Sequence, residues 1–206
     1  MLTIIDYGVG NLASMQNMLK KIGVPSVISS DETVIGKASK IILPGVGAFD
    51  TCVAKLTSSG LLPVLNDKAI QEKVPVLGVC VGMQLLMEGS DEGQLPGLGW
   101  IKGRIIKFNQ KLIPAGLKIP HMGWTDVVPA KESKLFKEMY DHPRFYFVHS
   151  YHPSLADSSD ALVHAEYGYQ FVAGMERGNI AGVQFHPEKS HKFGMKLLAN
   201  FAAVNS

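Results

Sequence analysis

Cysteine is scarce in this sequence: Cys52 and Cys80 are the only two among 206 residues. Two cysteines cannot build the dense disulfide framework of small secreted domains, and they suit a reducing cytosol. No stretch approaches the roughly 20 apolar residues that a membrane-spanning helix needs. The first apolar run stops at Asp6 and has no basic segment before it, unlike a signal peptide. The sequence therefore predicts a cytoplasmic protein without a membrane segment.

An excess of charge of one sign is also lacking. Lys and Arg number 20 and Asp and Glu 18, which gives a formal net charge of +2. A surplus this small does not favour binding to nucleic acid or to an anionic membrane. Hydrophobic residues make up 46% of the chain, enough for a folded core. Neither a repeat nor a linker rich in Pro, Gly or Ser divides the chain, so we predict one domain over residues 1–206.

Short β-rich segments alternate with helical patterns in the first half of the chain. Strands are predicted at residues 3–7, 24–28, 40–43 and 74–79, and helices at 12–22 and 61–73. Strands separated by helices indicate a parallel sheet. Beyond Gly97 the predicted strands follow one another with few helices between them, at residues 100–108, 118–128, 145–148, 161–165 and 171–175. A core strand at 180–185 and a helix at 190–203 complete an α/β fold: a mostly parallel sheet with an antiparallel extension.

Cys80 is the candidate nucleophile. It lies in Gly78-Val79-Cys80-Val81-Gly82, directly after an apolar predicted strand and before a predicted helix. This spacing is that of a nucleophile elbow, in which glycines permit a sharp turn and the start of a helix favours a thiolate. The alternative is a small core residue, since free cysteines are often buried. Cys52 has no flanking glycines and is predicted to be such a packing residue.

Seven histidines compete for the role of the general base that a cysteine nucleophile needs. His186 is favoured because it ends the apolar segment 181–185, and the carboxyl ends of parallel strands share one rim of a sheet. Glu188 follows two residues later, where a carboxylate can orient the imidazole. Alone, His186-Pro187-Glu188 is typical of a solvated loop. Beside the Cys80 elbow, it predicts a Cys-His-Glu triad.

An oxyanion formed on an amide needs backbone N–H donors. Pro44-Gly45-Val46-Gly47 follows the predicted strand 40–43, again at a carboxyl end. We expect the N–H of Gly47 or Val46 to act together with the N–H of Val81. An ordinary turn between a strand and a helix is the alternative for this segment.

These three motifs together resemble the class I (triad) glutamine amidotransferases. The elbow with Gln84 four residues after Cys80, the Pro44–Gly47 turn and His186-Pro187-Glu188 occur in the order of that family and span most of the chain. The resemblance implies a three-layer αβα, flavodoxin-like fold. It also implies that glutamine forms a thioester on Cys80 and releases ammonia, and that Gln84 helps to hold the substrate.

Further segments are similar to the glutaminase subunits of imidazole glycerol phosphate synthases: residues 6–11, 120–124, 146–151 and 189–190. This resemblance implies that Gly45, Ser150 and Tyr151 lie at the L-glutamine pocket. It also implies a heterodimer with a (β/α)8-barrel cyclase subunit that receives the ammonia, contacted by Asn11, Trp124, Tyr146 and Lys189. It calls for no cofactor and no metal ion.

Several alternatives stay open at this point. Gly97-Leu98-Gly99-Trp100 and residues 190–194 resemble paralogous glutaminases that supply ammonia for amidating surface-polysaccharide sugars. Gly8-Val9-Gly10 with Asp31 some 20 residues on fits a dinucleotide-binding redox domain, although a lone glycine pair is a weak signal. A non-catalytic regulatory subunit would be expected to have a broken triad. A cysteine peptidase would give no reason for Gln84 or Glu188.

Overall fold

A nine-stranded sheet runs through residues 1–204, the part of the chain that this computed structural model describes. Its order is β2-β1-β3-β4-β11-β10-β9-β6-β7. The first five strands in that order are parallel: β2 (Ser26–Ser29), β1 (Leu2–Ile5), β3 (Lys40–Gly45), β4 (Val76–Cys80) and β11 (Ile180–Val183). The other four are antiparallel: β10 (Tyr169–Arg177), β9 (Ala161–Tyr167), β6 (His121–Pro129) and β7 (Arg144–His149). The predicted parallel sheet with an antiparallel extension is confirmed.

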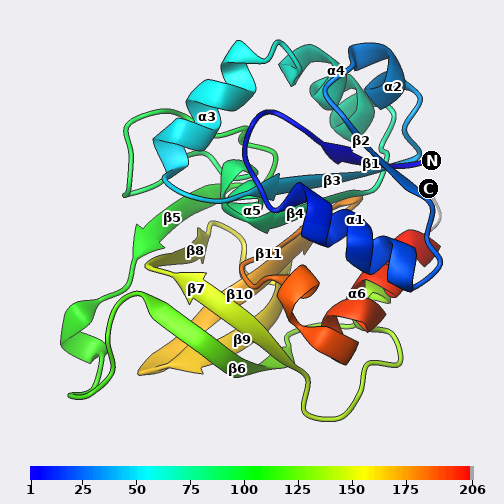
Figure 1. Cartoon of the computed structure of the whole chain (residues 1–206). Coiled ribbons are helices and arrows are strands. Elements are labelled where there is room, and N and C mark those ends of the chain that lie inside the picture. Colours follow the sequence, from blue (N-terminus) through cyan, green and yellow to red (C-terminus); the bar gives the residue numbers. More distant parts are fainter. Residues whose placement is uncertain (205–206) are drawn as a thin grey trace.

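Helices cover both faces of the parallel half and make a three-layer αβα arrangement (Figure 1). On one face lie α2 (Glu32–Gly36), α3 (Phe49–Ser58) and α4 (Leu62–Asn66), with α5 (Val81–Leu85) packed against α3. On the other lie α1 (Leu12–Lys21) and α6 (His191–Ala203). The apolar face of α1 buries Met15 and Leu19. Because helices cover both of its faces, β4 is buried along its whole length.

Two sequence expectations need correction. The helix predicted at 61–73 is broken into α4 and a wider π-helical turn, Asp67–Gln71. The strand predicted at 100–108 is shorter, β5 (Gly103–Lys107), and pairs in a separate two-stranded sheet with β8 (Tyr151–Leu155), which was not predicted. Gly103 has φ 124° and its missing side chain leaves room for the Ser154 carbonyl, so the strand begins there. Pro153 hides the strand pattern of β8.

The parallel register places three strand ends beside one another. Gly45 at the end of β3 lies opposite Cys80 at the end of β4, and Val183 of β11 lies opposite Val79 of β4. Strand ends that are 35 and 104 residues apart in sequence therefore meet at one rim. In the described part of the chain, no helix is long and apolar enough to cross a membrane.

Candidate active site

Cys80 lies at the sharp turn between β4 and α5. Its backbone has φ 56° and ψ −117°, a conformation that L-residues rarely adopt and that clusters at functional sites. The flanking glycines permit it: a Cβ on Gly78 would lie 2.7 Å from the Met83 Cα, and a Cβ on Gly82 would collide with the Leu43 carbonyl. A strained turn of this kind presents a side chain at the top of a sheet.

His186 and Glu188 form a buried pair beside this turn. His186 Nδ1 lies 2.8 Å from Glu188 Oε1, and their side chains are 3% and 2% exposed. The carboxylate can only accept, so Nδ1 carries the proton. The Ser190 hydroxyl donates to the His186 carbonyl at 2.6 Å and accepts from the Tyr146 N–H at 3.0 Å. This clamp fixes the turn η5 (Pro187–Lys189) against β7.

Opposing effects act on the pKa of His186. Burial lowers it, but hydrogen bonding and charge from Cys80 and Glu188 raise it further, to about 10. The imidazole is therefore protonated at neutral pH when both anionic partners are present. Its Nε2 is buried and, apart from the contact with Cys80, has no hydrogen-bond partner among the described residues. That atom is available to exchange a proton with a reacting group.

Cys80 and His186 open into a cavity of about 390 Å³, within the size range of small-molecule sites. Its wall includes most of the residues proposed from the sequence, namely Gly47, Val81, Gln84, Ser150, Tyr151 and Lys189. Gly45 is not part of the wall. A Cβ on Gly45 would lie 2.5 Å from the Gly82 backbone N, so this glycine allows β3 to approach the elbow.

Two buried side chains hold the Pro44–Gly47 turn. The Tyr7 hydroxyl donates to the Pro44 carbonyl at 2.6 Å. The Cys52 thiol donates to the Val46 carbonyl at 3.4 Å, and Cys52 is fully buried on α3, as a packing residue should be. Gly47 has φ 93°, which favours glycine. Buried side chains therefore hold the Pro44 and Val46 carbonyls of the turn, while Val46 itself is 40% exposed.

Three buried histidines, His121, His149 and His152, support the part of the cavity lined by Ser150 and Tyr151. His149 Nδ1 lies 2.7 Å from the Tyr151 carbonyl, which can only accept, so this nitrogen carries the proton. His149 Nε2 must then accept from His121 Nδ1 at 2.9 Å, and His121 Nε2 accepts from the Thr125 hydroxyl at 2.7 Å. By the same reasoning His152 donates from Nδ1 to the Pro153 carbonyl (3.1 Å) and accepts at Nε2 from the Tyr169 hydroxyl (2.9 Å).

Burial lowers the pKa of all three histidines, that of His121 to about 4. Each is therefore neutral at physiological pH, in agreement with the tautomers that the hydrogen bonds require. Phe108 and Phe171 pack against these rings. The Tyr151 carbonyl is thus held by a network of neutral, buried histidines.

Gln84 lines the cavity and is joined to Cys80 through a second buried glutamine, Gln184. Gln84 Nε2 donates to Gln184 Oε1 at 3.1 Å, and Gln184 Nε2 lies 3.8 Å from Cys80 Sγ. Gln84 is 3% exposed and Gln184 0%. The side-chain hydrogen bonds therefore run from Gln84 through Gln184 to the Cys80 sulfur.

The residues proposed to contact a partner gather near the cavity. The Lys189 ammonium lies 5.7 Å from the centroid of the Tyr146 ring, and Trp124 lies edge-on to the same ring at 6.4 Å. Trp124 is 40% exposed and stacks on His191 at 5.4 Å. Asn11 precedes α1, which packs against η5. An aromatic and cationic surface therefore adjoins the cavity that holds Cys80.

The features that suggested a dinucleotide site have other roles. Asp31 accepts from the backbone N–H groups of Thr33 and Val34 and so caps α2. Gly10 has φ 112°, and a Cβ there would lie 3.0 Å from the Pro44 side chain. Gly10 therefore allows the turn before α1 to lie close to the Pro44 side chain.

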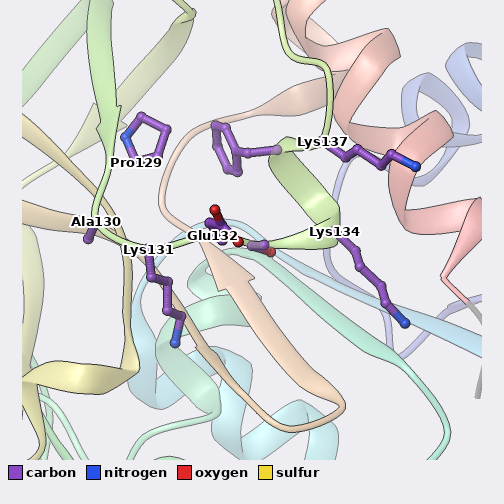
Figure 2. Close-up of a pocket in the computed structure, with 8 residues that line it drawn as sticks. Pro129, Ala130, Lys131, Glu132, Lys134 and Lys137 are labelled. Atoms are coloured by element: carbon purple, nitrogen blue, oxygen red, sulfur yellow. The ribbon is translucent and has the colours of Figure 1, made fainter.

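A larger hollow of about 690 Å³ lies away from Cys80, along residues 129–137 (Figure 2). Figure 2 shows the side chains of Lys131, Lys134 and Lys137 pointing in different directions rather than toward one point. Lys131 is already bound to the carbonyls of Ser159 and Glu176. Within residues 1–204, no group of three or more His, Cys, Asp or Glu side chains is arranged to hold a metal ion.

Among the polar side chains in and around the cavity, sequence reasoning missed Glu92, His149 and Gln184. Glu92 lines the cavity and accepts from the Phe49 N–H at 2.9 Å, but it stands in a polar segment without a motif. Gln184 did carry a signal. It interrupts the apolar segment that leads into His186, and a glutamine buried in a core strand must find hydrogen-bond partners.

Comparison with known proteins agrees with this geometry. Residues 3–204 match the family model described as glutamine amidotransferase class-I. A Methanococcus maripaludis protein named imidazole glycerol phosphate synthase subunit HisH 2 is 49% identical, with 98% of each chain covered. The subunit HisH of Bdellovibrio bacteriovorus is 47% identical, covering 99% of this chain and 100% of the relative.

Solved structures support the fold. The structure of PurLQS from Thermotoga maritima superposes with a TM-score of 0.72 at 18% identity and covers 97% of this chain and 96% of its own. A crystal structure described as a glutamine amidotransferase gives a TM-score of 0.70 at 17% identity, with 98% of this chain and 99% of the other covered. The chain therefore belongs to the class-I glutamine amidotransferase family and, within it, groups with the HisH subunits of imidazole glycerol phosphate synthase.

Proposed function

We propose that this chain hydrolyses L-glutamine to glutamate and ammonia and passes the ammonia to a cyclase subunit in histidine biosynthesis. The observation that supports the chemistry best is the His186–Glu188 pair, joined at 2.8 Å and buried beside the strained Cys80 turn. Cys80 and His186 line one cavity, and Glu188 is bonded to the other ring nitrogen of His186. This is the arrangement that acyl transfer from an amide requires.

In the proposed reaction, the Cys80 thiolate attacks the carboxamide carbon of glutamine. The resulting oxyanion accepts hydrogen bonds from the N–H groups of Gly47 and Val81. His186 gives the proton on Nε2 to the departing nitrogen, which leaves as ammonia, and a thioester with Cys80 remains. His186 then takes a proton from water, which attacks the thioester and frees glutamate. The carboxylate of Glu188 stabilises the imidazolium in both steps.

The cavity also offers groups for the amino-acid end of glutamine. Glu92 is an acidic side chain of the wall and can receive the α-ammonium group of the substrate. Ser150 and Tyr151 also line the cavity, where a hydroxyl and backbone N–H groups can bind the α-carboxylate. Gln84 lies beside the reacting end. Binding at both ends would place the carboxamide at Cys80.

The ammonia must reach its acceptor without entering bulk water, where it becomes ammonium and loses its nucleophilicity. We propose that a (β/α)8-barrel cyclase docks on the surface formed by Asn11, Trp124, Tyr146 and Lys189, as a heterodimer in the cytoplasm. Lys189 lines the cavity and also contacts Tyr146. The docking surface and the cavity therefore adjoin, which suits direct transfer.

Glutamate release by the purified chain, with and without the cyclase subunit and its nucleotide ligand, tests this function. We expect strong stimulation by the pair. In the complex, Cys80→Ser should abolish synthesis from glutamine but spare synthesis from ammonium salt, which separates a lost nucleophile from a lost complex. If a glutamine analogue still alkylated Cys80 but the cyclase gave no stimulation, the acceptor would be another synthase, such as a sugar-amidating one.

A further inference from the structure

Gln184 links the nucleophile to the cavity wall. It follows β11, is fully buried, and its backbone N–H donates to the Ala173 carbonyl at 2.9 Å. Its side chain spans the 3.8 Å to Cys80 Sγ and the 3.1 Å to Gln84 Nε2. A buried amide is destabilising unless its polar atoms are paired. These two contacts are therefore what makes a glutamine acceptable at this position.

The state of the sulfur sets the direction of these hydrogen bonds. A thiolate can accept a hydrogen bond but cannot donate one, so it selects the arrangement in which Gln184 turns its NH2 group toward Cys80. Gln184 then offers Oε1 to its neighbour, and Gln84 must donate with Nε2. A thiol that donated to Gln184 would favour both amides turned the other way.

The observed direction leaves one acceptor for the substrate. Gln84 Oε1 is buried and has no hydrogen-bond partner among the described residues, and Gln84 lines the cavity. Gln84 donates one N–H of its NH2 group to Gln184, which fixes the amide so that its carbonyl oxygen is the acceptor left without a partner. That oxygen is suited to an N–H donor, and glutamine carries such donors on its carboxamide and its α-ammonium group.

We propose that Gln184 is a further catalytic residue: its amide stabilises the Cys80 thiolate and at the same time fixes the orientation of Gln84 for substrate binding. This inference rests on the proposed glutaminase activity. It assigns two separable effects to one side chain. The contact with Cys80 acts on turnover, and the contact with Gln84 acts on substrate affinity.

Two substitutions separate these effects in the complex with the cyclase. Gln184→Met keeps the length of the side chain but removes both hydrogen bonds, so we expect kcat to fall and KM to rise, each about ten-fold. Gln184→Glu keeps an acceptor for Gln84 but places a carboxylate beside the thiolate. For this variant we expect KM within about two-fold of wild type and kcat lower by about ten-fold or more. Gln16→Met makes the same change on α1, where Gln16 bonds to Ser26, and should change neither.

Alkylation of Cys80 by iodoacetamide, followed by mass spectrometry at neutral pH, supplies a readout that needs no glutamine. The alkylation rate of Cys80 should fall about ten-fold in Gln184→Glu and less in Gln184→Met, since only the thiolate reacts. Buried Cys52 serves as the internal reference. Thermal unfolding checks the fold of each variant, and Gln184→Asn, whose shorter amide cannot span both contacts, replaces any variant that fails to fold.

Unchanged alkylation together with kcat and KM within two-fold of wild type would overturn the proposal. A rise of KM in Gln184→Glu equal to that in Gln184→Met would overturn the part that concerns Gln84. If the wild-type complex released no glutamate, the proposed function would fail instead. The alkylation rates would still decide whether Gln184 acts on the sulfur.

Discussion

Glu188 accepts a hydrogen bond from His186 at 2.8 Å although only Pro187 separates the two residues. Side chains two positions apart lie on different faces of a helix, and in an extended strand they share a face but stand roughly 7 Å apart. Pro187 begins the 3₁₀ turn η5, and the Ser190 hydroxyl closes it on the His186 carbonyl. The turn holds the Glu188 carboxylate against the His186 imidazole and restricts the rotation of both side chains. The ring is therefore oriented by residues of its own short segment.

The charge of Glu188 should matter more than its hydrogen bond. Gln at position 188 preserves size and can still accept from Nδ1, but it no longer stabilises an imidazolium. We expect Glu188→Gln to lower kcat for glutamine hydrolysis about 10²- to 10⁴-fold, as for other buried carboxylates that orient a catalytic histidine. The pKa of His186 should fall from about 10, which NMR titration of its ring can follow.

A matched change outside the triad controls for stability. Glu176→Gln alters a carboxylate that accepts from the Ser133 hydroxyl, away from Cys80. Its glutamine turnover should stay within about two-fold of wild type, as expected for surface substitutions. Equal turnover in the two variants would show that the charge of Glu188 has no part in catalysis.

Gly45 and Gly47 should respond differently to alanine. A Cβ on Gly47 meets nothing within 4 Å but must adopt φ 93°, so Gly47→Ala should cost about 1–2 kcal/mol and change the stimulation by the cyclase. A Cβ on Gly45 would lie 2.5 Å from Gly82 N, so Gly45→Ala should distort the elbow and destabilise more. Thermal unfolding and glutamate release with and without the cyclase separate the two. Unaltered stimulation in a folded Gly47→Ala variant would contradict the role of this turn.

The sequence predicts helices and strands correctly where the pattern of apolar residues is local. The apolar face of α1 and the continuous apolar run of β4 predict their elements because burial on one or two faces leaves a direct mark on the residues. The pattern fails at β8, where Pro153 interrupts it, and at residues 61–73, where the backbone widens from an α-helix into a π-turn without any change of residue type. The pairing of β5 with β8 depends on tertiary contacts, which no local sequence pattern predicts.

The candidate site likewise contains residues that the sequence predicts and residues that it does not. Cys80, His186 and Glu188 stand in short motifs whose glycines and proline reveal strained turns. The Glu92 carboxylate is held by the N–H of Phe49, 43 residues earlier, and no local motif predicts that contact. The Thr125–His121–His149 network joins two strands through side chains, and nothing in either strand predicts the other.

Trp124 should be a major contributor to docking. A stacked and 40% exposed tryptophan next to Tyr146 and Lys189 is the kind of residue that dominates interface energies. We expect Trp124→Ala to weaken binding to the cyclase at least about ten-fold, measured by titration calorimetry. Alkylation of Cys80 should be unchanged. Leu112→Ala removes another exposed apolar side chain outside this surface and should leave affinity as it is; equal losses would argue against a specific docking role.

Acid should destabilise the fold through the buried histidines. Burial lowers the pKa of His121, His149 and His152 below the ordinary value of 6.5. Just below pH 6.5, these histidines are therefore protonated in the unfolded chain but still neutral in the folded chain. Their contribution to stability is therefore present above pH 6.5 and is lost as the pH falls from 6.5 toward 4. His186 acts in the opposite sense: its raised pKa stabilises fully below pH 6.5 and loses that effect as the pH rises through 10.

Urea unfolding at several pH values between 4 and 7 measures this loss. Each histidine that stays neutral in the fold should reduce the free energy of unfolding by up to about 1.4 kcal/mol per pH unit in that window. His152→Phe keeps an aromatic ring among Phe108 and Phe171 but removes one proton-binding site, so the dependence on pH should become shallower even though the variant is less stable at pH 7. His164→Gln, a change outside this hydrogen-bonded network, is the control. A slope that stayed the same in His152→Phe would mean that other groups cause the acid sensitivity, since a ring that cannot bind a proton cannot contribute to it.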